Sequence, residues 1–117
     1  MNRRDISILF LVLCAITLAL SKGEADPDLW GHVTFGLDIL ESGQITRVDP
    51  YSYLTAGQTW INHEWLSEVL FGIAWNGGGN IGLNLLKYTV WLTTIGILCW
   101  YLIKAGLSGV RTGIVIL

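Results

Sequence analysis

Cysteine and histidine are scarce in this chain of 117 residues, which contains two of each. Two cysteines cannot build a disulfide scaffold, and these few ligands show no spacing typical of a zinc module. Charge is scarce as well, since 14% of the residues are Asp, Glu, Lys or Arg, against about 25% in a typical soluble domain. The low charge disfavours a disordered segment and a basic nucleic-acid binder.

Apolar residues are abundant instead, at 52% of the chain, and the mean hydropathy is +0.54. This composition points away from an ordinary soluble domain. The formal net charge of −2 conceals a segregation, because charged residues of each sign cluster at particular places along the chain.

The first apolar run covers residues 6–21, after a short basic start at residues 1–5. As a helix it would rise about 24 Å, at the lower limit for a hydrocarbon core of about 30 Å. A basic start and an apolar middle also describe a secretory signal peptide, here with a small-residue cleavage site ending at Ser21. This run alone fits either interpretation.

A second apolar run favours the membrane interpretation. Residues 81–103 contain one charged residue and would form a helix about 34 Å long, which is ample for a span. An exported protein cleaved after Ser21 would instead need this run to be a buried core helix. We therefore predict transmembrane helices at 6–21 and 80–103, a cytoplasmic turn at 104–112 and the start of a third transmembrane helix at 113–117.

Basic residues mark the same end of both spans. Arg3 and Arg4 precede the first span, and Lys104 and Arg111 follow the second. By the positive-inside rule these ends are cytoplasmic, so the loop at 22–79 is extracytoplasmic. That loop contains two basic and eight acidic residues, a net charge of −6.

The first half of the outer loop has the signals of a helix. Asp26 and Pro27 are typical of a helix start and Gly43 of a helix end, which predicts a helix at about 27–42. Its apolar residues share one side, so it could lie along the membrane surface.

The second half of the outer loop predicts two further elements. Apolar residues on both sides of a turn-like stretch predict a small hairpin at about 51–61. A second amphipathic surface helix is predicted at about 62–76, with Asn62 as its cap. The glycines at 77–79 would end it and turn the chain into the membrane.

Asp26 and Asp28 follow the first span closely, at the outer membrane surface. Such a D-x-D pair can hold a divalent cation, Mg²⁺ or Mn²⁺, beside a phosphate, and one carboxylate can act as a general base toward a hydroxyl. A helix start favours the same residues as a cap and as negative charge near the dipole. His32 would share the face of Asp28, as a ligand pair or as a local hydrogen bond.

Acidic and aromatic side chains share one face of the second outer helix, namely Glu64, Glu68, Phe71 and Trp75, with His63 at its entry. Rings that pack on C–H groups and acids that accept from hydroxyls suit a sugar or polyol site. A solvated acidic face with interfacial tryptophans would give the same pattern.

The second span carries one polar stripe, formed by Asn80, Asn84 and Lys87 at helical spacing. An ionisable residue in a span indicates function, with a phosphate or an outer carboxylate as its partner, although Lys87 is shallow enough to snorkel to the surface. The stripe would also suit packing against another helix. Cys14 and Cys99 lie in apolar helix and are interpreted as packing residues.

Three motifs occur in order in the outer loop: DPDLWGH at 26–32, DPYSY at 49–53 and HEWL at 63–66. Together they resemble the first large extracytoplasmic loop of a group of bacterial polytopic membrane proteins. That group is similar to the GT-C superfamily of membrane glycosyltransferases, which use polyprenyl-phosphate-linked sugars. Three linked motifs are far more specific than a single D-x-D pair.

The resemblance implies a multi-pass helical protein of the bacterial inner membrane, with an essential acid just after the first span. On this hypothesis Asp28, or Asp26, deprotonates an acceptor hydroxyl or holds a metal, and Lys87 offers positive charge to the donor phosphate. The sugar site would comprise His32, His63, Glu64, Glu68 and Trp65.

GT-C enzymes have many more spans, so we expect this chain to be the N-terminal part of such a protein and inactive alone. Its expected partners are the lipid bilayer, the polyprenyl-phosphate-linked sugar and either further transmembrane helices or a partner subunit, with no nucleic acid. The alternative is a non-catalytic assembly subunit. Its acidic outer loop would be an interaction surface, and Asp26 and Asp28 would be caps.

Overall fold

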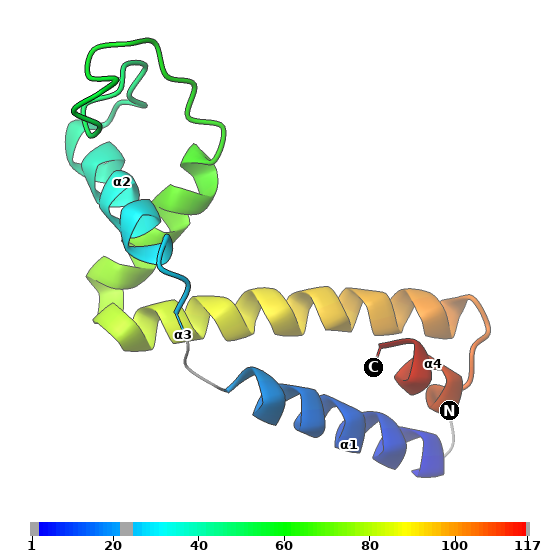
Figure 1. Cartoon of the computed structure of the whole chain (residues 1–117). Coiled ribbons are helices and arrows are strands. Elements are labelled where there is room, and N and C mark those ends of the chain that lie inside the picture. The colour runs from blue at the N-terminus through cyan, green and yellow to red at the C-terminus, as the bar shows by residue number, and fades with distance from the viewer. Residues whose placement is uncertain (1–2, 22–24, 117) are drawn as a thin grey trace. The chain divides into compact units, whose positions relative to one another are not determined.

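The computed structural model describes residues 3–21 and 25–116 and is mostly helical (Figure 1). Residues 1–2, 22–24 and 117 lie outside this description; they belong to the predicted cytoplasmic start, the beginning of the outer loop and the third span. The chain divides into one unit of residues 25–88 and another of residues 1–24 with 89–117. The helices are α1 (Arg3–Leu20), α2 (Leu29–Ser42), α3 (Trp65–Lys104) and α4 (Gly109–Ile116).

Helix α3 is the one helix in the described residues that is long and apolar enough to cross a membrane. Only 6% of its apolar stretch is buried within the chain, whereas the core helix of a soluble protein would be mostly buried. The apolar stretch described in α1, Phe10–Ala19, is shorter than that of α3. The architecture is therefore consistent with a helical membrane protein, and the span at residues 6–21 stays a prediction.

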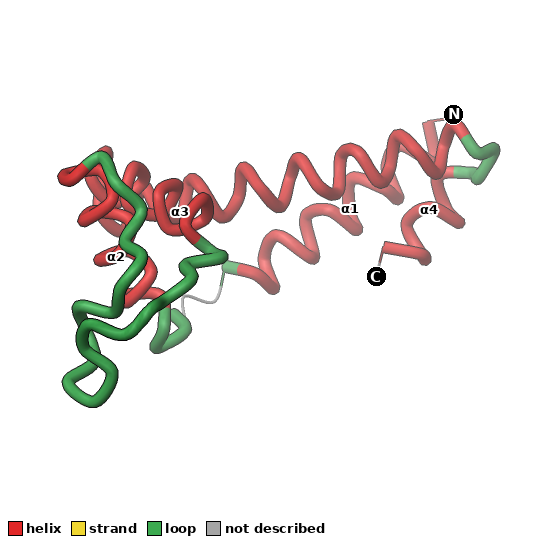
Figure 2. The backbone as a smooth tube through the Cα atoms, turned by 90° about the horizontal axis from the view of Figure 1, so that it is seen from above, coloured by secondary structure: helices red, strands yellow, loops and turns green. Residues whose placement is uncertain are grey.

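The unit that contains both ends of the chain packs α1 against α4, beside the 89–104 part of α3 (Figure 2). Cys99 is buried and Cys14 is half-buried, in agreement with packing roles. Helix α4 begins at Gly109, before the predicted start at 113, so the turn at 104–112 is shorter than predicted. The cause is Ser108, whose carbonyl accepts from the Thr112 amide at 2.9 Å and whose hydroxyl accepts from the Arg111 amide at 3.5 Å.

In the unit of residues 25–88, α2 has the end signals expected from the sequence but begins two residues later than 27. The Asp26 carboxylate accepts from the Asp28 amide at 3.0 Å, and the Asp26 carbonyl accepts from the Leu29 amide at 3.0 Å. At the other end Gly43 has φ 65°, in the left-handed region, and its amide donates to the Ile39 carbonyl at 2.9 Å. Asp26 and Gly43 therefore set the limits of α2.

The predicted hairpin at 51–61 is wrong in its register. The described pairing is one antiparallel bridge between Val48 and Thr59, and the next pair is joined by the Trp60 amide donating to the Arg47 carbonyl at 2.9 Å. Residues 51 and 52 form a bend and irregular backbone, and residues 53–57 form a turn, instead of a strand.

The Asp49 side chain explains this change of register. Its carboxylate accepts from the amides of Tyr51 and Ser52 at 2.9 and 3.0 Å and from the Thr55 hydroxyl. Amides that donate to Asp49 cannot pair with an opposite strand. These hydrogen bonds, with that of Thr55 the strongest influence, hold the pKa of Asp49 below its usual value.

Aromatic rings attach this loop to α2. Phe35 of α2 lies 4.4 Å from Tyr51 and 5.6 Å from Trp60 between ring centroids. The Tyr51 hydroxyl donates to the Asp38 carboxylate of α2 at 2.6 Å. Partial burial, together with this hydrogen bond, raises the pKa of Tyr51. The loop is thereby held on one side of α2.

Helix α3 begins at Trp65, not at 62, because the Asn62 side chain turns back to accept from the Glu64 amide at 3.1 Å. It also runs past the predicted end at 76. The break falls instead at Gly78 and Gly79, and Gly79 (φ 54°, ψ −131°) occupies a backbone region that glycine tolerates best. The predicted surface helix and the predicted second span are thus two parts of α3.

Helix α2 and the first part of α3 cross in direct backbone contact (Figure 1). A Cβ at Gly36 would overlap the Glu68 carbonyl oxygen, and a Cβ at Gly72 would lie 2.8 Å from the Gly36 carbonyl carbon. Both glycines are buried. Only residues without a side chain permit so close an approach.

The first part of α3 is oriented opposite to a usual amphipathic surface helix. Leu66, Leu70 and Ile73 are 57%, 44% and 53% exposed, whereas Glu68 is 2% exposed. Its acidic face therefore packs on α2, and its apolar face is left for lipid or further protein.

Replacement of Gly36 with alanine should destabilise the protein by about 1–3 kcal/mol, because the new methyl group overlaps backbone that cannot easily move. Thermal unfolding followed by circular dichroism measures this. Gly31→Ala is the matched control on the same helix, since its Cβ would meet only Phe35 side-chain atoms at 3.9 Å or more. Equal stability of the two variants would show that the helices do not cross at Gly36.

Acid should release the loop around Asp49. Since the folded pKa of Asp49 is lowered, its contribution is complete above the ordinary carboxyl value and is lost as the pH falls through the lowered value. The amide resonances of Tyr51 and Ser52 should therefore shift only below about pH 4 in an NMR titration. Asp49→Asn retains an acceptor oxygen without this titration, so an acid step that persists in this variant would assign it to another group.

Candidate functional site

A shallow groove of about 440 Å³ lies on the unit of residues 25–88. The start of α2 supplies four of its lining residues and the start of α3 supplies three; they are Asp26, Asp28, Leu29, His32, Glu64, Ser67 and Phe71. The fold thus brings together acids and a histidine from the first and third sequence motifs.

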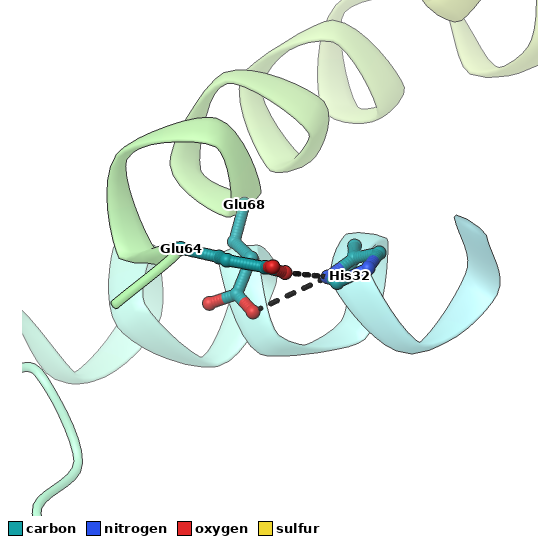
Figure 3. A group of neighbouring side chains, drawn as sticks. All are labelled: His32, Glu64 and Glu68. Carbon is teal, nitrogen blue, oxygen red and sulfur yellow. Dashed lines mark hydrogen bonds and ion pairs between the residues drawn. The ribbon is translucent and has the colours of Figure 1, made fainter. Parts of the chain in front are cut away.

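Figure 3 shows the carboxylates of Glu64 and Glu68 directed at the ring of His32. The His32 Nδ1 atom lies 3.5 Å from Glu64 Oε2 and 3.4 Å from Glu68 Oε1. In the described residues this is the one group of three side chains that could hold a metal ion, with ligand atoms within 4.8 Å of one another. We call it the His–Glu cluster.

Glu68 is the most constrained member of the His–Glu cluster. Its side chain is 2% exposed, and Oε2 accepts a hydrogen bond from the Asn62 side-chain amide, which is itself buried. A buried carboxylate is expensive unless its oxygens have partners. The Asn62 side-chain amide donates to Oε2 of Glu68, and the His32 ring faces Oε1.

The glycine crossing positions this cluster. His32 precedes Gly36 by four residues on α2, and Glu68 precedes Gly72 by four on α3. Residues four apart share a helix face, so the close approach at Gly36 and Gly72 brings His32 and Glu68 together one turn away.

Aromatic side chains border the His–Glu cluster. The His32 ring lies 6.4 Å from Phe35 and 6.3 Å from Phe71 between centroids. Trp30 of α2 and Trp75 of α3 pack edge to face at 5.3 Å. Contacts of this type contribute about 0.5–1.5 kcal/mol each beyond burial. The predicted aromatic side of a sugar site is therefore packed against α2.

The two aspartates of the D-x-D pair differ in their environment. The Asp26 carboxylate accepts from the Asp28 amide, which stabilises the turn that precedes α2. Asp28 is exposed and makes no side-chain capping hydrogen bond. Both aspartates line the groove, and of these two predicted catalytic residues Asp28 is the one whose side chain makes no cap hydrogen bond. The Asp26–Asp28 metal site stays a prediction.

Three predicted site residues belong neither to the groove lining nor to the His–Glu cluster. The His63 side chain is 81% exposed, with Nε2 3.5 Å from Glu64 Oε1. Trp65 lines a separate apolar depression with Trp60. Lys87, beyond the kink of α3, lies over the ring of Tyr88 at 4.8 Å.

Two residues of this site were not predicted to have a role in it. Ser67 lines the groove, and its hydroxyl donates to the Glu64 carbonyl at 2.7 Å. Asn62 was expected only as a helix cap, but it also donates to Glu68. The sequence spacing of Asn62 and Glu68 does not predict this hydrogen bond, because the hydrogen bond depends on the conformation of the turn that precedes α3.

No family model, curated protein or solved structure matches this chain.

Asn62→Ala should lower the free energy of unfolding by about 1–3 kcal/mol, because the Glu68 carboxylate would lose its buried donor. Thermal unfolding in detergent measures the loss. Asn76→Ala removes an exposed asparagine from α3 and should leave the stability nearly unchanged. If Asn62→Ala unfolded at the same temperature as the parent protein, the Asn62 side chain would not stabilise the buried Glu68 carboxylate.

Proposed function

We propose that this chain is the N-terminal portion of a membrane glycosyltransferase that takes a sugar from a polyprenyl-phosphate donor on the extracytoplasmic side. The observation that carries the proposal is the groove, in which acids and a histidine of two separate motifs converge. The resemblance of the three ordered motifs to GT-C-like membrane proteins supports the same reaction class.

The proposed step is transfer of the sugar to an acceptor hydroxyl. The acceptor oxygen forms a bond to the anomeric carbon, the bond from that carbon to the phosphate oxygen breaks, and the electron pair leaves with the lipid phosphate. Asp28 accepts the proton of the acceptor hydroxyl, as a general base in reach of solvent. Lys87 does not line the groove, so we propose no role for it in this step.

The surroundings of the groove support a reaction at a membrane surface. Helix α3 continues from the groove into a stretch that is long and apolar enough to span a bilayer. The apolar face of its first part, with Leu66, Leu70 and Ile73, is exposed. A donor with a polyprenyl tail is held in lipid, so we propose that this face lies against lipid or further transmembrane helices.

Asp28→Asn in the complete gene product that contains this sequence should reduce sugar transfer at least about 100-fold, the range expected for loss of a general base. Membranes supplied with a radiolabelled lipid-phosphate sugar provide the assay. Glu41→Gln removes the same charge from the exposed end of α2 and should leave turnover unchanged.

Normal turnover of the Asp28→Asn variant would exclude Asp28 as the base. If the gene product transferred no sugar at all, and Asn84→Leu disrupted co-purification with a partner protein, the assembly-subunit alternative would replace the enzyme.

A further inference from the structure

We propose that His32, Glu64 and Glu68 bind one divalent transition-metal ion, of which zinc is the best-fitting example. The site differs from the Asp26–Asp28 pair expected from the sequence. It does not depend on the proposed transfer reaction, because binding of the ion alone defines it.

The distances within the His–Glu cluster fit metal ligation better than hydrogen bonding. His32 Nδ1 lies 3.4 and 3.5 Å from the two carboxylate oxygens, whereas a charge-assisted N–H···O bond is about 2.7–2.9 Å long. Ligands about 2.0–2.1 Å from a tetrahedral zinc ion are separated by about 3.4 Å from one another. Two of the three separations match this value, and the two carboxylate oxygens, which lie within 4.8 Å of each other, could close on one ion by rotation of their side chains.

The number of hydrogens that His32 can donate also favours a metal ion over hydrogen bonding in this cluster. Nδ1 of His32 carries at most one hydrogen, yet two carboxylates face it, one from α3 and one from the residue that precedes α3. One hydrogen cannot serve both oxygens well, and the two negative charges repel each other. A divalent cation would accept a lone pair from Nδ1 and from each carboxylate and would offset both charges.

The cluster has both a rigid and an open side, as a metal site with a remaining coordination position requires. Glu68 is buried and held by Asn62, which is the kind of outer hydrogen bond that orients a ligating carboxylate. The side chains of His32 and Glu64 are 31% and 48% exposed and line the groove. An ion there would be reachable from the groove.

The ligand set favours a transition metal over magnesium or calcium. Imidazole nitrogen is a good ligand for zinc and other late first-row ions, whereas magnesium and calcium prefer oxygen only. Zinc should therefore bind more tightly than manganese, and magnesium should compete weakly.

The test is titration of the whole chain, purified in detergent and stripped of metal, with zinc chloride in an isothermal calorimeter. We expect one equivalent of zinc to bind. His32→Ala and Glu64→Gln should each weaken this event more than about 100-fold, beyond the roughly 10–100-fold that loss of an outer hydrogen bond costs. Both replaced side chains are partly exposed, so the variants should fold, which circular dichroism checks.

Glu41→Gln is the matched control, since it removes an exposed carboxylate at the other end of α2 from His32, and should leave zinc affinity unchanged. Absence of a one-equivalent event in the parent chain would overturn the metal site, as would equal affinity of parent and His32→Ala. Zinc binding in a protein without transferase activity would sustain this site while removing the function proposed above. Loss of zinc binding with transfer intact would do the reverse.

Discussion

The contact on which the outer unit depends is the one between two backbones, at Gly36 and Gly72. A side chain at either position would separate α2 from α3. The separation set there determines whether His32 reaches Glu68 one turn away, whether Trp30 meets Trp75, and whether the starts of both helices border one groove. The chemistry of the site is therefore a consequence of two residues that have no side chains.

This contact also explains why Glu68 can be buried. Its carbonyl lies against Gly36 while its carboxylate reaches back to His32 and Asn62, so both polar parts of the residue are engaged by α2 and the preceding turn. The leucine and isoleucine side chains of the same helix then remain outside. If this face lies against lipid, as we propose, the arrangement is favourable. Exposed apolar side chains can contact lipid, whereas an acidic side chain there would have no hydrogen-bond partner.

Local signals in the sequence predicted part of this structure and could not predict the rest. Asp26 and Gly43 mark the limits of α2 because capping depends on neighbours in the chain. The hairpin register was wrong because the Asp49 carboxylate takes the amides that strand pairing would need. The burial of Glu68 could not be predicted, since amphipathic periodicity identifies two faces of a helix without saying which one packs. Of the residues predicted for the site, Asp28, His32 and Glu64 line one groove, whereas Trp65 and Lys87 lie elsewhere; their roles stay predictions.

The two glycines and the two residues that they position form a pattern that can be searched for in other genomes. It reads H-x-x-x-G followed, thirty-six residues after its histidine, by E-x-x-x-G, that is His32 and Gly36 with Glu68 and Gly72. Exposed side chains elsewhere on these helices can change type, but neither glycine can gain a side chain without moving the other helix. Distant relatives of this chain should therefore be recognisable by this spaced pair when their overall similarity has been lost.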